Sequence, residues 1–294
     1  MRKFFQRIWL FLTAPFRWLS RGMNTILRKS FLGVFFEDDP EDTPLLDSIQ
    51  KATEAPKDIF DSAIEHITTL RKHLFRAVVV LILTSALSFV YIEEIMAWLT
   101  QPIGGINELR AIEVTEAIGV VMRIGFISGL VMALPYISFE ILLFVASGIS
   151  RRARLIGLVG IPFVAIFFAL GVIFTYYSML PAALDVLVDF MGIQADLRPN
   201  SYFRFTTGLM FWIGIAFEFP LVSLVLSSMG VISSKTLKDH WRLAFILLAV
   251  LAAMITPTID PYNMLVVLIP LWGLYGLSIL MAGIGGRKSK QGSN

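Results

Sequence analysis

Long apolar segments alternate with short polar ones along most of the chain. Six mostly apolar segments lie near residues 74–92, 117–146, 155–180, 204–229, 241–256 and 262–284. A bilayer core about 30 Å thick requires roughly 20 apolar residues per helix. The pattern therefore predicts an all-α integral membrane protein with six transmembrane helices.

The flanks of these segments alternate in charge. The acidic flank 93–116 carries five Glu against Arg110, whereas "SRRAR" at 150–154 and "SSKTLKDHWR" at 233–242 are basic. Cytoplasmic loops are enriched in Lys and Arg, so both termini and the basic loops are predicted on the cytoplasmic side. The expected topology is N-in and C-in.

The fifth segment is unusually short. At 1.5 Å per residue, its run of about 16 residues reaches only about 24 Å. Since this is less than the hydrocarbon thickness, the bilayer thins there or the helix does not cross completely. The tight connection "TPTIDPYN" joins it to the sixth segment.

The ends of the chain differ from its apolar part. Residues 1–36 are basic and show apolar residues at helical spacing, which predicts an amphipathic helix on an anionic lipid surface. Residues 37–63 are acidic and interrupted by prolines, which predicts a solvated, largely disordered linker. The membrane domain is expected over 64–286, with a basic tail at 287–294.

Composition narrows the possible functions. Hydrophobic residues make up 56% of the chain, charged residues 16%, and no Cys is present, which excludes disulfides and thiolate chemistry. His66, His73 and His240 lie in flanks without ligand spacing, and no phosphate loop is found. We expect neither an enzyme nor a cofactor, a metal or a nucleic-acid partner.

Three ionisable residues fall inside apolar segments: Arg123, Glu140 and Glu218. Such residues cost at least a few kcal/mol in a bilayer and normally face a partner or a cavity. Arg123 is near the outer end of its segment and can snorkel. Glu140 lies some seven residues from the cytoplasmic end of its segment.

Glu218 lies about 21 Å from the outer end of its segment and cannot snorkel easily. Pro220 follows two residues later and frees a backbone carbonyl. A kink and a small polar pocket are therefore expected there. The alternative is a carboxylate bonded to a neighbouring helix to fix packing.

Taken together, the polar motifs resemble the TatC subunit of the twin-arginine protein translocase. The resemblance runs from Glu65 to Gly283 through five ordered motifs, which are "EHITTLRKHL", "VTEAIGVVMRIGF" with Glu116 and Arg123, "ALPYISFEILLFVASGISRRAR", "YFRFTTGLMFWIGIAFEFPLV", and "AAMITPTIDPYNMLVVLIPLWGLYG". The resemblance implies a concave bundle with short fifth and sixth helices in a prokaryotic cytoplasmic membrane.

The resemblance also implies partners and site residues. The partners are signal peptides of exported proteins, single-span TatA/TatB-type proteins and further copies of the chain. The implied signal-peptide-binding residues are Glu65, His66, Leu70, Arg71, Phe144 and Arg154. Glu218 and Glu140 are expected as intramembrane polar or partner contacts, and Pro135, Pro220, Thr256, Pro257 and Asp260 as structural turn residues.

Three acids typical of the resembled family are absent, because the positions hold Thr69, Ala153 and Gly276. Bidentate pairing of an Arg with a carboxylate is the natural way to read paired arginines. Glu65, one helical turn before Thr69, is one possible replacement. Glu140 and the acidic stretch 37–61 are the others.

Three functions remain open at this point. The first is a core translocase subunit that binds signal peptides at the cytoplasmic face and assembles with TatA/TatB-type partners to export folded proteins. The second is a related protein that has lost twin-arginine recognition. The third is a proton-coupled small-solute transporter with Glu218 and Glu140 as its relay, although no repeat between the two halves supports it.

Overall fold

A computed structural model describes residues 56–113, 115–146, 148–190, 193–194, 197–256 and 261–287. The predicted basic extension, most of the acidic linker, Pro257, Asp260 and nearly all of the basic tail lie outside the described residues. All structural statements below concern the described ranges.

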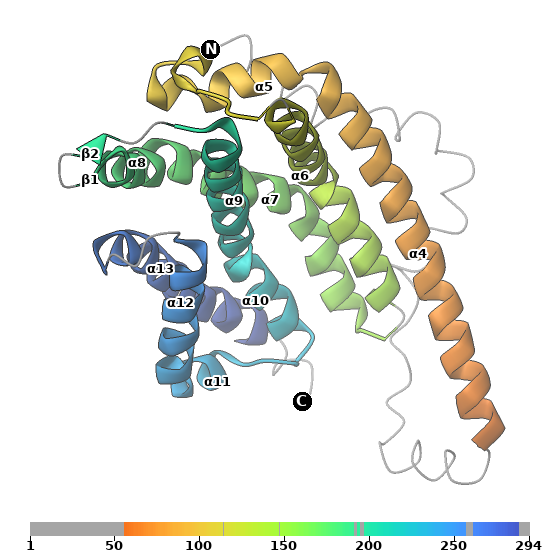
Figure 1. The fold of residues 1–294 in the computed structure, drawn as a ribbon. Coiled ribbons are helices and arrows are strands. Elements are labelled where there is room, and N and C mark those ends of the chain that lie inside the picture. The colour runs from red at the N-terminus through yellow and green to blue at the C-terminus, as the bar shows by residue number, and fades with distance from the viewer. Residues whose placement is uncertain are drawn as a thin grey trace. The chain divides into compact units, whose positions relative to one another are not determined.

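Helices make up nearly all of the described chain (Figure 1). They are α4 (Pro56–Val90), α5 (Ile92–Leu99), the 3₁₀ turns η1 (Gln101–Ile103) and η2 (Ile106–Glu108), α6 (Glu116–Ala146), α7 (Arg151–Phe174), the π-helical turn η3 (Thr175–Met179), α8 (Leu180–Val188), α9 (Pro199–Phe217), α10 (Phe219–Ser228), α11 (Ser234–Asp239), α12 (Trp241–Ile255) and α13 (Pro261–Arg287). Two-residue strands β1 (Asp189–Phe190) and β2 (Ile193–Gln194) pair antiparallel, with Asp189 opposite Gln194.

The predicted membrane class is confirmed. Five helical stretches in the described part of the chain are long and apolar enough to cross a bilayer: His66–Val90, Glu116–Ala146, Arg151–Leu184, Pro199–Ser228 and Met264–Gly286. The predicted fifth crossing is the short α12, whose 15 residues reach about 22 Å.

Two predicted boundaries need correction. The sixth helix is not short, because α13 extends over 27 residues, or about 40 Å, from Pro261 through the glycines near its end. In addition, α4 begins at Pro56, so residues 56–63 of the predicted linker are helical. Proline is favoured at the first position of a helix, because it has no N–H that would lack a partner there and its φ is already helical. This explains why α4 begins at Pro56 and α13 begins at Pro261.

The kink predicted in the fourth segment is confirmed. The helix breaks at Glu218, which separates α9 from α10, and the N–H of Glu218 donates to the carbonyl of Ile215 at 3.0 Å. Pro220 lies in the first turn of α10. Because proline cannot donate a backbone hydrogen bond, the helix has to restart at this point.

The contacts divide the chain into two compact units. One contains Met1–Val80 and Pro135–Ile161, and the other contains Leu81–Leu134 and Pro162–Asn294. Two of the boundaries fall at Pro135 and Pro162, within α6 and α7. We refer to them as the first and the second unit.

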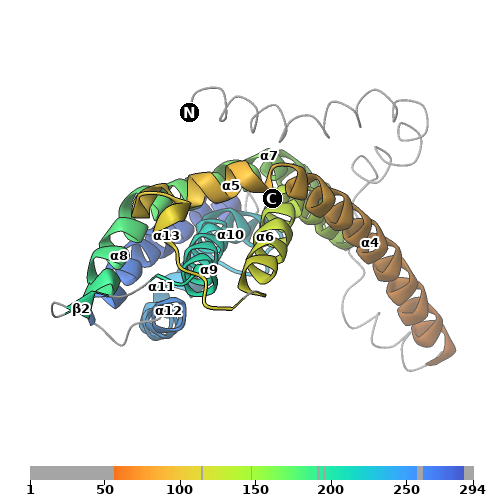
Figure 2. The ribbon, with the colours of Figure 1, turned by 45° about the horizontal axis from the view of Figure 1, so that its top comes forward.

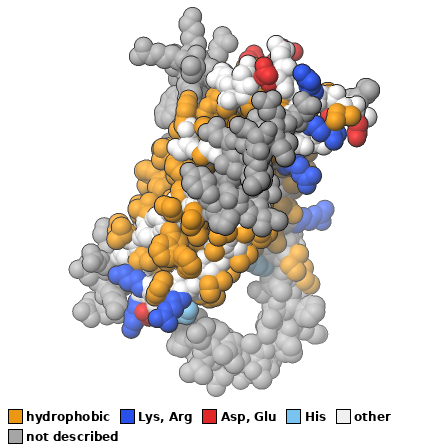
Figure 3. Space-filling view, turned by 60° about the vertical axis from the view of Figure 1, so that its left-hand side comes forward, with side chains coloured by type: hydrophobic (Ala, Val, Ile, Leu, Met, Phe, Trp, Pro, Cys, Tyr) orange, Lys and Arg blue, Asp and Glu red, His pale blue; other side chains and the backbone are white. Residues whose placement is uncertain are grey.

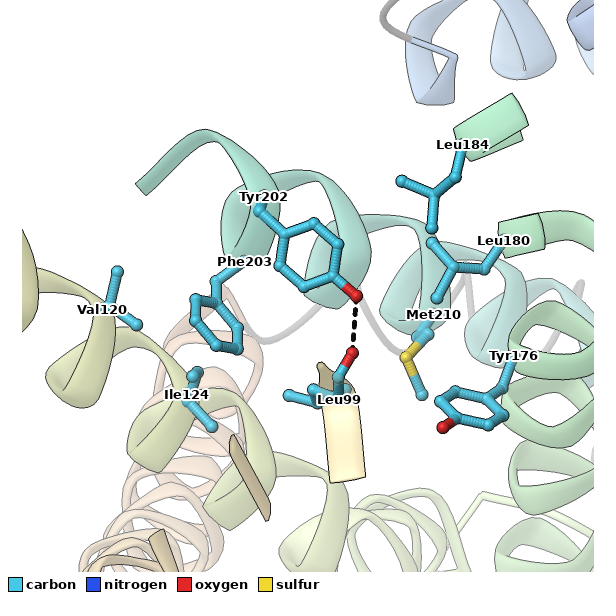
Figure 4. Close-up of a cluster of buried hydrophobic side chains, with 9 residues drawn as sticks. All are labelled: Leu99, Val120, Ile124, Tyr176, Leu180, Leu184, Tyr202, Phe203 and Met210. Atoms are coloured by element: carbon cyan, nitrogen blue, oxygen red, sulfur yellow. Dashed lines mark hydrogen bonds between the residues drawn. The ribbon is translucent and has the colours of Figure 1, made fainter. Parts of the chain in front are cut away.

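A buried cluster in the second unit holds α5 in place (Figure 4). Its members are Leu99, Val120, Ile124, Tyr176, Leu180, Leu184, Tyr202, Phe203 and Met210. The Tyr202 hydroxyl donates to the Leu99 carbonyl at 2.6 Å, and the Tyr176 hydroxyl donates to the Trp98 carbonyl at 2.9 Å. The two tyrosines therefore cap the carbonyls at the end of α5, which have no partner within the helix.

Small residues bring α10 and α13 together in the same unit. The Ser227 hydroxyl donates to the Ala282 carbonyl at 2.6 Å, and a Cβ atom added to Gly285 would lie 2.7 Å from the Leu224 carbonyl oxygen. A second apolar cluster joins α9, α12 and α13, and Figures 1 and 2 both show α12 beside α13. Close approach through small residues is typical of helices packed in membranes.

The long helices expose large apolar side chains. Examples are Ile82, Phe126, Val222 and Ile269, which are between 48% and 68% exposed. Figure 3 shows hydrophobic side chains over much of one face, with charged side chains mostly towards its margins. Such a surface would be unstable in water, and it fits a lipid environment.

An ion pair between Glu116 and the partly exposed Arg198 joins the start of α6 to the start of α9. The Glu116 carboxylate, only 3% exposed, accepts from Arg198 Nη2 at 2.5 Å and Arg198 Nε at 3.0 Å, and from the Ile112 N–H at 3.1 Å. We expect Arg198→Ala to lower the free energy of unfolding, because it leaves the Glu116 carboxylate with only the Ile112 N–H as a donor among the described residues.

Thermal unfolding in detergent checks this prediction, with Arg242→Ala as the control because Arg242 is exposed on α12. A double variant, Arg198→Ala with Glu116→Gln, should recover part of the loss. Equal melting temperatures for Arg198→Ala and the control would show that the pair contributes nothing.

Candidate functional site

The first unit contains a buried carboxylate surrounded by donors. Glu140 on α6 is only 3% exposed. Its Oε2 lies 2.6 Å from His73 Nδ1, and its Oε1 accepts from the Tyr136 hydroxyl at 2.7 Å. Nη1 of Arg76 lies 3.6 Å from Oε1, which is an ion-pair distance. We call these four residues the Glu140 cluster.

Helical spacing brings the cluster together. His73 and Arg76 are three residues apart on α4, and Tyr136 precedes Glu140 by four residues on α6. Residues at these spacings lie on one face of a helix. The sequence analysis named Glu140 as a site residue but not its three neighbours. His73 and Arg76 resembled an ordinary basic flank, and Tyr136, one turn before Glu140 in the same apolar segment, was the only signal of the cluster.

An aromatic side chain adjoins the cluster. The ring centroid of Phe144, one turn after Glu140, lies 4.4 Å from that of His66 and 6.2 Å from that of His73. The structure thus brings together His66 and Phe144, which the sequence had proposed for signal-peptide binding, and it places Glu140 one turn from Phe144.

The other proposed binding residues are less closely associated with the cluster. Leu70 and Arg71 lie on exposed positions of α4, and Leu70 is 45% exposed. Glu65 lies in α4, and its side chain is outside the described part of the structure. Arg154 is buried and its Nε donates to the Ile149 carbonyl at 3.0 Å, which ties the start of α7 locally.

The positions of the absent acids differ in character. Ala153 is fully buried in the first turn of α7, and Thr69 is half-buried on α4. Gly276 on α13 has open space, since an added Cβ atom would meet nothing within 4 Å. A carboxylate at the Ala153 position would therefore face a closed environment in this chain.

Glu218 forms a second polar site, in the second unit. Its Oε1 is buried and has no hydrogen-bond partner among the described residues. The backbone of Phe168 on α7 lies against this carboxyl group. Close by, a Cβ atom on Gly171 would lie only 2.8 Å from the Gly214 Cα, so α7 and α9 pack almost in backbone contact.

The remaining predicted residues are placed in helices or at their ends. Pro135 lies within α6, and Pro220 is fully buried at the start of α10. The Thr256 hydroxyl and the Thr256 N–H both donate to the Ala252 carbonyl at 2.9 Å, which closes the last turn of α12. The described residues hold no group of three or more potential metal ligands.

The helices and polar sites define the class of protein. The chain is a multi-pass, all-α membrane protein with charged residues placed in contact inside its spans. The family model of "Sec-independent protein translocase protein (TatC)" matches residues 65–270. The chain belongs to this family.

Individual relatives agree with the family match. The chain is 31% identical to the TatC protein of Synechocystis over 225 residues, which cover 76% of this chain and 88% of that protein. It is 30% identical to the TatC protein of Deinococcus radiodurans over 254 residues, covering 83% and 92%. A crystal structure of the twin-arginine translocase receptor TatC matches with a TM-score of 0.64 at 25% identity, covering 75% of this chain and 99% of that one.

These comparisons confirm the resemblance seen in the sequence. The chain is a core subunit of a Tat protein translocase and a multi-pass protein of the prokaryotic cell membrane. It belongs to a protein-transport family, and neither the solute transporter nor the related protein without twin-arginine recognition is favoured.

Proposed function

We propose that the Glu140 cluster receives an arginine of the signal peptide. The single observation that supports this role is a buried carboxylate held by one weakly bound and half-exposed cation. Arg76 is 45% exposed and lies 3.6 Å from Oε1, whereas His73 and Tyr136 lie within 2.7 Å of the two carboxylate oxygens.

If a signal-peptide arginine replaces Arg76, the buried negative charge of Glu140 keeps a positive partner. An incoming guanidinium takes the position of Arg76 at Oε1, while His73 and Tyr136 keep their contacts with the carboxylate. A guanidinium presents a planar fork of donors that a lysine ammonium lacks, so an arginine is preferred over a lysine. The neighbouring rings of Phe144 and His66 offer an apolar face on which a guanidinium can stack.

This assignment accounts for the acids absent at Thr69 and Ala153. Glu140 is the carboxylate of the first unit whose side chain the structure describes, and Glu65 lies about two turns before His73 on α4. Glu65 is the proposed contact for the second arginine. The recognition site would thus be displaced along α4 rather than lost.

Photo-crosslinking in nanodiscs tests this function. A signal peptide with paired arginines should label the protein about tenfold more strongly than one with paired lysines, since a lysine ammonium keeps the charge but loses the second hydrogen bond of a bidentate pair. In Glu140→Gln this preference should disappear. Gln keeps the shape of the side chain. Its Oε1 can accept from one of the two neighbours and its Nε2 can donate to the other, since a neutral imidazole nitrogen and a tyrosine oxygen can both accept, so the variant should fold.

Glu94→Gln is the matched control, because Glu94 is an exposed carboxylate in α5. Its melting temperature and crosslinks should both equal those of the unmodified protein. If Glu140→Gln keeps the arginine preference and Glu65→Gln loses it, Glu65 is the recognition residue and Glu140 is structural. Arginine preference retained in both variants would contradict the proposal.

The proposed partners follow from the other sites. TatA/TatB-type single-span proteins would contact Glu218 with a polar residue of their membrane helix. Self-association with further copies, and attachment of the basic extension 1–36 to anionic lipid, complete the proposed assembly. The acidic linker 37–63, whose last eight residues belong to α4, the membrane domain 64–286 and the tail 287–294 keep their proposed roles. The chain is proposed to act without enzymatic activity.

A further inference from the structure

Two arginines in the second unit lie within spans near the ends of their helices. Arg123 is seven residues from the first residue of α6, and Arg204 is five residues from the first residue of α9. At 1.5 Å per residue these positions are about 10 and 8 Å inside the helix ends. Both ends belong to the predicted outer side of the membrane.

A buried threonine fixes the orientation of Arg123. Thr207 on α9 is 5% exposed, and its hydroxyl donates to the Phe203 carbonyl at 2.5 Å. Since the hydroxyl has a single proton, it meets Arg123 as an acceptor, and Arg123 Nε donates to it at 3.3 Å. One edge of the guanidinium is thus engaged, while no hydrogen bond in the described structure involves its terminal nitrogens.

Arg204 brings a second positive charge to this place. It is three residues before Thr207, on the same face of α9, and its charge acts on Arg123. Neither arginine forms an ion pair with a described carboxylate, because the Glu116 carboxylate two turns away is engaged by Arg198. Two positive charges within a membrane span repel each other and are costly in lipid, so a bound anion would stabilise them.

We infer that Arg123 and Arg204 together bind the phosphate group of an anionic phospholipid in the outer leaflet. A guanidinium group presents a planar fork of N–H donors, so it can donate two parallel hydrogen bonds to the oxygens of one phosphate. A phosphate from solution offers the same chemistry. A lipid is favoured because Met122 and Phe126, which flank Arg123 on α6, are 58% and 52% exposed and can contact acyl chains.

Native mass spectrometry of the full chain tests this site. The protein is released from micelles containing either phosphatidylglycerol or phosphatidylcholine, and bound lipid is counted. We expect phosphatidylglycerol to be retained preferentially and its affinity to fall about tenfold in Arg204→Gln, since one guanidinium–phosphate contact is lost. Thr207→Val should give a smaller loss, because it frees the Arg123 side chain without removing its charge.

Lys235→Gln is the matched control, since Lys235 is an exposed cation on α11. Arg204 is exposed as well, so its substitution should leave the melting temperature in phosphatidylcholine unchanged. The inference is overturned if Arg204→Gln and the control retain the same amount of phosphatidylglycerol. It is also overturned if inorganic phosphate alone displaces the lipid or raises the melting temperature equally, since the ligand would then be a free anion.

Discussion

A Glu218→Gln variant is expected to fold and to bind signal peptides normally but to lose transport of folded cargo. The Oε1 atom of Glu218 is buried without a hydrogen-bond partner among the described residues, where the helix breaks between α9 and α10. A buried polar atom without a partner costs about 1–3 kcal/mol, so the carboxyl group is a poor choice for stability alone.

A partner helix would satisfy this carboxyl group. Loss of that hydrogen bond leaves a buried polar group without a partner, at a cost of about 1–3 kcal/mol, and should weaken partner assembly by roughly five- to a hundredfold. By contrast, the melting temperature of the isolated chain should stay equal or rise. Weaker partner assembly with an unchanged or higher melting temperature would indicate that Glu218 contacts a partner. A lower melting temperature would indicate that it stabilises the fold.

Transport into membrane vesicles and co-purification of TatA/TatB-type partners are the two measurements. Glu94→Gln serves again as the control, since it removes an exposed carboxylate from the same unit. Unimpaired transport by Glu218→Gln would remove the proposed role. A lowered melting temperature together with normal partner binding would assign Glu218 to helix packing instead.

A Gly129→Ala substitution is expected to destabilise the second unit by at least about 3 kcal/mol, the upper part of the range for overpacked sites. A Cβ atom at Gly129 would overlap the Cα of Ser85 on α4 and lie 2.6 Å from its backbone N. Backbone atoms cannot rotate away as a side chain can, so α4 and α6 must separate. The hydrogen bond from the Thr84 hydroxyl to the Gly129 carbonyl, 2.9 Å long, would then be lost.

Gly119→Ala is the matched control in the same helix, because an added Cβ atom there meets nothing within 4 Å. It should leave stability unchanged or raise it by up to about 1 kcal/mol, the helix preference of Ala over Gly. Thermal unfolding in detergent compares the two. If both variants melt at the same temperature, the close approach of α4 and α6 at Gly129 contributes little to stability.

Much of the fold could be predicted from the order of apolar and polar residues. Spans of 20 or more apolar residues have few alternatives to helices in a bilayer, because all backbone groups must be bonded within the segment. The break at Glu218 followed from Pro220, which cannot continue the backbone hydrogen bonding. The length of the sixth helix was predicted less well, since the family resemblance implied a short helix whereas α13 extends over 27 residues.

The candidate site was predicted only in part. The family motifs indicated His66 and Phe144, whereas Glu140 and Glu218 were indicated by the cost of polar groups in apolar helices. Their partners could not be read in the same way. His73 and Arg76 resembled an ordinary basic flank, and only the packing of α4 against α6 shows that they meet Glu140.

The sequence by itself determined the class, the helical spans and the family resemblance, since each depends on residues near one another in the chain. Tertiary structure alone decided which charges are paired. Glu140 contacts a histidine and an arginine, and Glu116 pairs with Arg198. Glu218 has one oxygen without a hydrogen-bond partner in the described structure. The physical reason is that the energy of a buried charge depends on atoms a few ångströms away, which local sequence patterns do not specify.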